Sequence, residues 1–103
     1  MMTKEELLFH EIGSKIPNSI KGQLFGKACY KAGKKAYVCF FENEMVFKLT
    51  GERHSDALSL DGASLFDPSR KGRPMKEWVQ VPFDYQELWE GFALSAFEYV
   101  GGN

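Results

Sequence analysis

The segment at residues 23–49 most constrains the fold of this chain. Its apolar and polar residues alternate over three short runs, which turn-forming residues separate at positions 32–33 and 42–44. Glycine and asparagine in such turns supply the positive φ angles that tight hairpins require. The segment therefore predicts a three-stranded antiparallel meander.

The length of the second turn decides which face of this meander is buried, because the side chains of a strand alternate between two faces. A three-residue turn puts Cys39 and Met45 on the face beneath the helices and leaves Val38 and Phe40 on the outer face. A two-residue turn at 42–43 instead puts Met45 on the face of Val38 and Phe40. We favour the three-residue turn because it gathers four lysines on the outer face, namely Lys27, Lys31, Lys34 and Lys48.

Amphipathic helices flank the meander at both ends of the chain. Thr3 with Glu6, and Asp84 with Glu87, have the spacing of a capping box, and an apolar stripe follows each pair. A short helix at 55–60 and a further strand at 77–81 complete the pattern. The sequence predicts a two-layer α+β fold, in which N- and C-terminal helices cover an antiparallel sheet built from the meander and the further strand.

Length and charge limit the class of protein. With 103 residues, of which 44% are hydrophobic, the chain can bury one core, so we expect a single domain over 1–103. A net charge of -1 gives no overall attraction to nucleic acid or to an acidic membrane. The N-terminus lacks the pattern of a secretory signal, and no run approaches the ~20 apolar residues of a membrane span. We therefore expect a cytoplasmic protein with no membrane partner.

The two cysteines are predicted to be buried, reduced thiols. A turn at 32–33 would place Cys29 and Cys39 three positions out of register, whereas a disulfide needs α-carbons within about 7 Å. His10 and His54 are single residues without the paired spacing of a zinc site. The sequence thus predicts no disulfide and no metal site.

No group of residues has the pattern of a catalytic centre. His54, Ser55 and Asp56 are adjacent, but a hydrolytic triad must converge from separate segments. We therefore expect a protein that is not an enzyme, with no catalytic residue and no cofactor. Trp78 and Trp89 are more typical of a core than of a ligand pocket. A small-molecule-binding domain or enzyme with a pocket between helices and sheet remains an alternative.

Short motifs spread over nearly the whole chain are similar to those of a known family. They are Phe25-Gly26, Phe47-Lys48, Leu60-Asp61-Gly62-Ala63, Phe66-Asp67-Pro68, Gly72-Arg73-Pro74-Met75 and Trp78-Val79-Gln80-Val81-Pro82. Together they resemble the TfoX N-terminal-domain-like family. The resemblance implies a two-layer α+β domain, related to the part of bacterial competence regulators that acts through protein contacts, and it carries over no catalytic residue. In full-length regulators a second, helical domain follows, whereas this chain ends at Asn103. We therefore expect a stand-alone copy here.

The outer sheet face and the segment at 67–81 supply a candidate interaction surface. The segment is rich in turn residues and cations, which keep it in water. If both helices lie on the opposite side of the sheet, the apolar residues of the outer face cannot all be covered, so we expect a homodimer. The candidate surface consists of Phe25, Lys27, Lys31, Lys34, Val38, Phe40, Lys48, Arg70, Lys71 and Arg73.

Two kinds of partner fit such a surface. Clustered cations attract phosphates, so a nucleic-acid-binding domain that uses the lysine face and the basic loop at 70–76 is one alternative. Lysines on an outer strand face also simply keep a sheet soluble, and the net charge is slightly negative. We therefore expect a regulatory module that binds an unknown protein partner.

Overall fold

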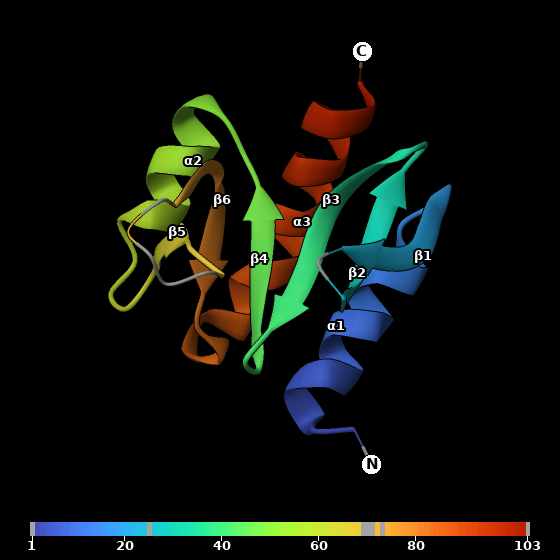
Figure 1. Cartoon of the computed structure of the whole chain (residues 1–103), viewed down its shortest axis with the longest axis horizontal. Coiled ribbons are helices and arrows are strands. Elements are labelled where there is room, and N and C mark those ends of the chain that lie inside the picture. Colours follow the sequence, from blue (N-terminus) through green and yellow to red (C-terminus); the bar gives the residue numbers. More distant parts are fainter. Residues whose placement is uncertain (1, 25, 69–71, 73, 103) are drawn as a thin grey trace.

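Six antiparallel strands form one sheet, in the order β1-β2-β3-β4-β6-β5 (Figure 1). The computed structural model describes residues 2–24, 26–68, 72 and 74–102. The strands are β1 (Ser19–Leu24), β2 (Lys27–Ala32), β3 (Lys35–Phe41), β4 (Glu44–Lys48), β5 (Ser64–Phe66) and β6 (Met75–Val81). The helices are α1 (Lys4–Lys15), α2 (Gly51–Leu58) and α3 (Gln86–Gly101), and the 3-10 turn η1 (Phe83–Tyr85) precedes α3.

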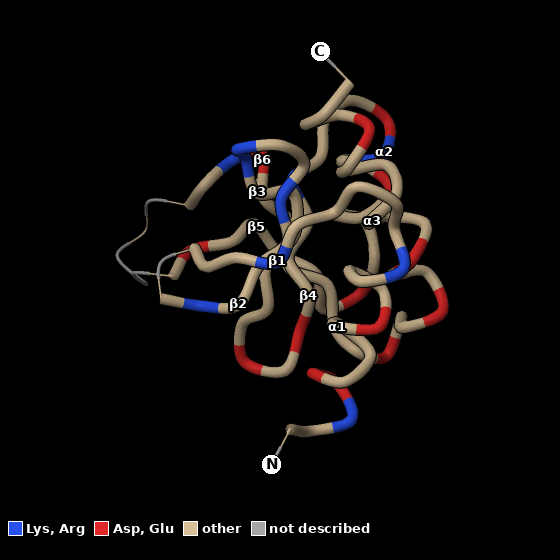
Figure 2. The backbone as a smooth tube through the Cα atoms, turned by 90° about the vertical axis from the view of Figure 1, so that its right-hand side faces the viewer, with Lys and Arg blue, Asp and Glu red and all other residues tan. Residues whose placement is uncertain are grey.

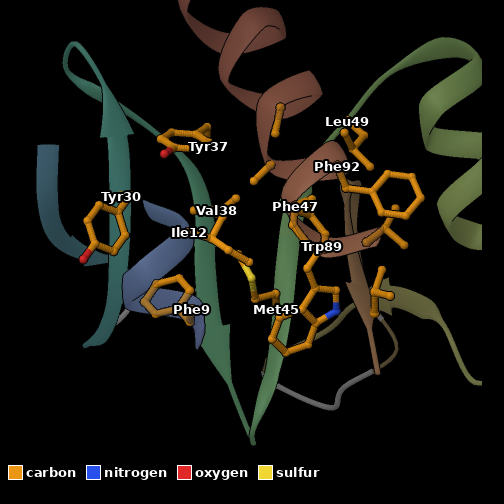
Figure 3. Close-up of a cluster of buried hydrophobic side chains, with 14 of the residues drawn as sticks. Phe9, Ile12, Tyr30, Tyr37, Val38, Met45, Phe47, Leu49, Trp89 and Phe92 are labelled. Carbon is orange, nitrogen blue, oxygen red and sulfur yellow. The ribbon is translucent and has the colours of Figure 1, made fainter. Parts of the chain in front are cut away.

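The two long helices α1 and α3 cover one face of this sheet, and α2 packs beside β6. We call the covered side the helix face and the opposite side the far face. Phe9 and Ile12 of α1 and Trp89 and Phe92 of α3 point toward strand side chains of the helix face (Figure 3). The predicted two-layer α+β fold is confirmed.

The two helix starts differ from each other. The Thr3 hydroxyl accepts a hydrogen bond from the Glu6 backbone N–H at 3.1 Å, so the predicted cap of α1 is confirmed. The predicted capping box of Asp84 and Glu87 is wrong. The 3-10 turn η1 occupies the expected start, and α3 begins one residue later, at Gln86, without a side-chain cap.

The turn between β3 and β4 has two residues, so the favoured register is wrong and its alternative is correct. Phe41 lies opposite Glu44, and Glu42 and Asn43 between them have φ angles of 50° and 63°. Two successive positive φ angles are typical of the tightest hairpin turn. As a result, Val38 and Phe40, which are alternate residues of β3, belong to the helix face, in the same core as Met45 and Phe47.

The sheet has two edge strands that the sequence did not predict. β1 covers residues 19–24, of which only the last two fall in the predicted meander, and β5 lies between the predicted short helix and the predicted further strand. Both strands are short or polar, so the apolar alternation that marks a strand is weak in them. The four strands β1 to β4 therefore replace the predicted three-stranded meander.

The far face carries its own buried cluster, although neither α1 nor α3 packs on this face. Cys29, Cys39, Val46, Phe66 and Trp78 are at most 6% exposed. Leu24 of β1 and Phe66 of β5, which lie at opposite edges of the sheet, both belong to this cluster. The sheet therefore curls around its far face and covers that face with its own edges.

The two cysteines lie directly opposite each other in this cluster. The hairpin turns at Gly33 and Lys34, and the pairing of β2 with β3 shifts between Tyr30 and Lys31, which brings Cys29 opposite Cys39. Both thiols are buried and free, so the predicted burial is confirmed. The predicted three-residue offset is wrong, because the turn lies one residue later than expected, which removes two positions of the offset, and the irregular pairing removes the third.

Candidate functional site

The structure separates the residues of the predicted interaction surface. Phe25, Arg70, Lys71 and Arg73 lie outside the described residues. Val38 is fully buried in the helix-face core. Phe40 packs against Phe9 of α1, with ring centroids 5.3 Å apart. Neither of these two side chains therefore belongs to an outer face.

The observed placement does not support self-association through the far face. The predicted homodimer required uncovered apolar side chains there, yet Val38 and Phe40 face the helices and Val46 is fully buried. The chain itself covers the far-face cluster. What remains of the predicted surface among the described residues is its lysines.

Three of those lysines, Lys27, Lys31 and Lys34, belong to a region without acidic residues. Residues 19–41, which we call the lysine ribbon, contain five lysines and no aspartate or glutamate, a net charge of +5. Since the whole chain carries -1, the remaining residues carry -6. In Figure 2, which looks toward β1, most carboxylate-bearing residues lie on α1, α2 and α3. The ribbon consists of Lys21, Lys27, Lys31, Lys34 and Lys35 with the strands β1, β2 and β3 that carry them.

Neighbouring groups position three of the ribbon lysines. The Lys27 ammonium lies over the Phe41 ring, 5.4 Å from its centroid, which is within cation–π range. Lys31 lies against Gly22, since a Cβ on that glycine would come 2.8 Å from Lys31 Cε. Lys21 is paired with Tyr30 and thus extends on the helix-face side of β1.

Lys48 belongs to a different site. Its ammonium lies 3.9 Å from a Glu77 carboxylate oxygen, and the Tyr99 hydroxyl donates a hydrogen bond to the same carboxylate at 2.6 Å. This hydrogen bond to Glu77 is the main cause that raises the pKa of Tyr99. Lys48 and Tyr99 line an open pocket of about 200 Å³ together with Lys35 and Val100. The pocket suits a small anion, but Glu77 already neutralises one of its two ammonium groups.

A polar cluster joins α1 to β2, and the sequence pattern alone did not reveal it. His10 Nδ1 lies 2.9 Å from the Tyr30 hydroxyl, and Ser14 Oγ lies 3.3 Å from the same hydroxyl. A Cβ on Gly13 would come 2.4 Å from the Tyr30 ring, so the close contact requires a glycine. The spacing of His10 and Ser14, four residues apart on one helix face, is the only signal for this cluster in the sequence.

Electrostatics keep this cluster neutral. Burial lowers the pKa of His10, Lys21 acts in the same direction, and Glu6, whose carboxylate lies 3.9 Å from His10 Nε2, opposes both. His10 is therefore uncharged at neutral pH. Since Tyr30 is only 4% exposed, the cluster holds α1 against the sheet and leaves the Tyr30 hydroxyl little access to a substrate.

The adjacent residues His54, Ser55 and Asp56 do not converge. His54 Nε2 lies 2.7 Å from the backbone carbonyl oxygen of Lys76, and Asp56 forms an ion pair with Arg53 at 3.4 Å. Arg53 in turn lies over the Phe92 ring, 4.4 Å from its centroid. These contacts hold α2 against β6 and α3.

The remaining findings concern metal binding, membrane-spanning helices and similarity to known proteins. Within the described ranges, no three His, Cys, Asp or Glu side chains are grouped closely enough to hold a metal ion, and no helix has the length and apolar character needed to cross a membrane. Comparison with protein-family models, curated proteins and solved structures gave no match to this chain.

Proposed function

We propose that this chain is a non-catalytic regulatory module that binds another protein through the lysine ribbon. Its resemblance to the TfoX N-terminal-domain-like family implies action through protein contacts. The observation that carries the proposal is the separation of charge, with +5 on residues 19–41 and -6 on the rest of the chain. A partner with an acidic surface would be drawn to the ribbon and repelled by the helices.

The sign of the charge argues for a partner other than a second copy of this chain. Two ribbons brought face to face would place like charges together, which costs free energy and suppresses that pairing. The partner would also gain apolar contacts, because Ile20 on the ribbon is 53% exposed. Charge would thus select the partner and apolar contact would add affinity.

The extent of the ribbon favours a protein over a nucleic acid. A nucleic acid is a long anion that continues beyond any single patch, whereas charges are screened only over about 10 Å at ordinary salt. On this small protein a long anion would therefore meet carboxylates of the acidic remainder as well as the ribbon. An acidic patch on a protein can be confined to the size of the ribbon.

The test is binding of a short fluorescent polyglutamate peptide, no longer than β1, and of longer single- and double-stranded DNA, followed by anisotropy over a range of salt concentrations. We expect the wild type to bind polyglutamate at least as tightly as DNA. The triple variant Lys27→Glu, Lys34→Glu, Lys35→Glu should lose this binding. The matched control Lys4→Glu, Lys15→Glu, Lys76→Glu has the same change in net charge outside the ribbon and should retain most of it.

Two results would contradict the proposal. DNA binding at least tenfold tighter than polyglutamate binding, lost only in the ribbon variant, would assign the ribbon to nucleic acid. Equal loss of binding in both triple variants would show that only net charge matters and that the ribbon is not a binding surface.

A further inference from the structure

The strand β1 forms a free edge of the sheet. Among the described residues β1 pairs only with β2, and at six residues it is twice as long as the opposite edge strand β5. A free edge presents unpaired backbone N–H and C=O groups that can pair with an added strand. An extended segment of another chain could therefore continue the sheet at β1.

Two lysines flank this edge from opposite faces. Lys31 extends from β2 on the far face and lies across Gly22, where a Cβ would come 3.4 Å from its ammonium nitrogen. Lys21, the next residue along β1, projects toward the helix face, as its pairing with Tyr30 shows. Neither ammonium forms an ion pair with a described carboxylate. Both faces beside the edge thus carry an unpaired positive charge.

An apolar side chain lies next to these lysines. Ile20 is paired with Lys31 and therefore also projects on the far face, where it is 53% exposed. Contact between this exposed isoleucine and an apolar side chain of an added strand would stabilise the complex. An added strand would therefore meet the Lys31 ammonium beside position 22 of β1, the Lys21 ammonium at position 21 and the Ile20 side chain at position 20.

We propose that β1 accepts an extended acidic segment of the partner protein as a seventh strand, an inference that rests on the proposed function and gives its binding geometry. Successive side chains of a strand point to opposite faces, so two adjacent carboxylates in the segment would reach Lys31 and Lys21. In an antiparallel pairing, the residue after the carboxylate pair would contact Ile20 and should be apolar. The recognised pattern is two acidic residues followed by a β-branched apolar residue.

Charge complementarity selects this occupant over the alternatives. A second copy of β1 would bring its own Lys21 beside this one, and like charges on paired strands are destabilising. A nucleic acid has no backbone N–H and C=O ladder that could continue the sheet. An acidic peptide segment satisfies the backbone groups of the edge and the two ammonium groups together.

The test uses a fluorescent peptide, acetyl-Thr-Val-Thr-Glu-Glu-Val-Thr-Val-amide, with anisotropy to measure affinity and hydrogen exchange to locate the contact. We expect Lys21→Glu and Lys31→Glu each to weaken binding about fivefold or more. Lys76→Glu on β6 makes the same charge change at the other side of the sheet and should have little effect. Amides of β1 should exchange more slowly in the complex, because those that face outward gain hydrogen bonds.

Two control peptides separate strand addition from simple charge attraction. A peptide with Lys-Lys in place of Glu-Glu should not bind. A peptide with proline in place of the two threonines that flank Glu-Glu-Val keeps the charge but cannot continue the ladder. The proline peptide should bind much more weakly than the parent peptide.

The results that would overturn the inference are distinct from those that would overturn the proposed function. Binding that depends on ribbon lysines but leaves the β1 amides unprotected, or that tolerates proline, would retain the acidic partner and reject strand addition. Self-pairing of β1, seen as a dimer in sedimentation, or binding of DNA with protection of β1, would reject the acidic segment as the occupant. Absence of peptide binding up to millimolar concentration would reject the inference even if polyglutamate binds.

Discussion

Each face of the sheet carries a buried apolar cluster, but different elements cover the two clusters. On the helix face, side chains such as Val38 are covered by separate elements, α1 and α3. On the far face, Val46 and its neighbours are covered by the curled edges of the same sheet. An apolar strand face without a helix over it is therefore not necessarily a surface for a partner. On this protein the partner surface is better sought in unpaired charge and unpaired backbone than in apolar content.

The largest expected effect compares one large side chain from each face. Trp89 of the helix face and Phe66 of the far face are both fully buried. If both clusters are true cores, Trp89→Ala and Phe66→Ala should each lower the free energy of unfolding by about 3–5 kcal/mol, as such truncations do in close-packed interiors. Urea denaturation measures both. A cost below about 1 kcal/mol for Phe66→Ala would show that the far face is only loosely covered.

The contact of α1 with the sheet can be tested at Gly13. An added methyl group would meet the Tyr30 ring at 2.4 Å, so Gly13→Ala should lower the free energy of unfolding by about 1–3 kcal/mol through overpacking, despite the higher helix propensity of alanine. The matched control Gly91→Ala lies on α3, where the nearest atom is a flexible arginine nitrogen at 3.5 Å. That variant should be neutral or stabilising. Equal effects in the two variants would contradict the close contact.

The cysteine pair gives the far face a dependence on alkaline pH. Burial, with a smaller contribution from Cys29, raises the pKa of Cys39 from 9.0 to about 12. Below pH 9 the thiol is protonated in both states, whereas above pH 9 the unfolded chain loses this proton first. Stability should therefore fall as pH rises from 9 toward 12, by about 1.4 kcal/mol per pH unit from this group. In Cys39→Ala the slope of unfolding free energy against pH should be shallower, and an unchanged slope would contradict the burial of this thiol.

The smallest effect concerns His10 on the helix side. The pKa of His10 is lower in the folded chain than in the unfolded one. As pH falls below 6.5, the imidazole of the unfolded chain is therefore protonated at a higher pH than that of the folded chain. Stability contributed by neutral His10 should be present above pH 6.5 and should decline as pH falls through the folded pKa. His10→Gln should flatten the loss of stability between pH 7 and 5 in chemical denaturation. Identical pH profiles for wild type and variant would remove His10 as a cause.

The sequence predicted the elements with strong periodic patterns and missed those that depend on tertiary packing. The start of α1, the central strands and the two-layer arrangement were predictable, because Thr3 and the apolar alternation act locally. The register was not predictable, because Glu42 adopts a positive φ that glutamate rarely takes, and so the turn is shorter than expected. The shift between Tyr30 and Lys31 that aligns the cysteines likewise has no sequence signal.

The candidate site was predictable in composition but not in geometry. A run of lysines without carboxylates is visible in residues 19–41. That Lys31 lies across Gly22 at the free edge depends on β1 being a strand, and β1 has too few apolar residues to be recognised. Val38 and Phe40 were assigned to the surface only because the register was wrong.

The central claim is that the lysine ribbon, and not the helix layer or the pocket beside Lys48, is the binding surface. The most direct measurement is a two-dimensional amide NMR spectrum of the labelled protein, recorded during titration with the Glu-Glu peptide. We predict that the resonances that shift cluster in residues 19–41 and are largest on β1. Shifts concentrated on α1 and α3, or around Lys48 and Tyr99, would contradict the claim.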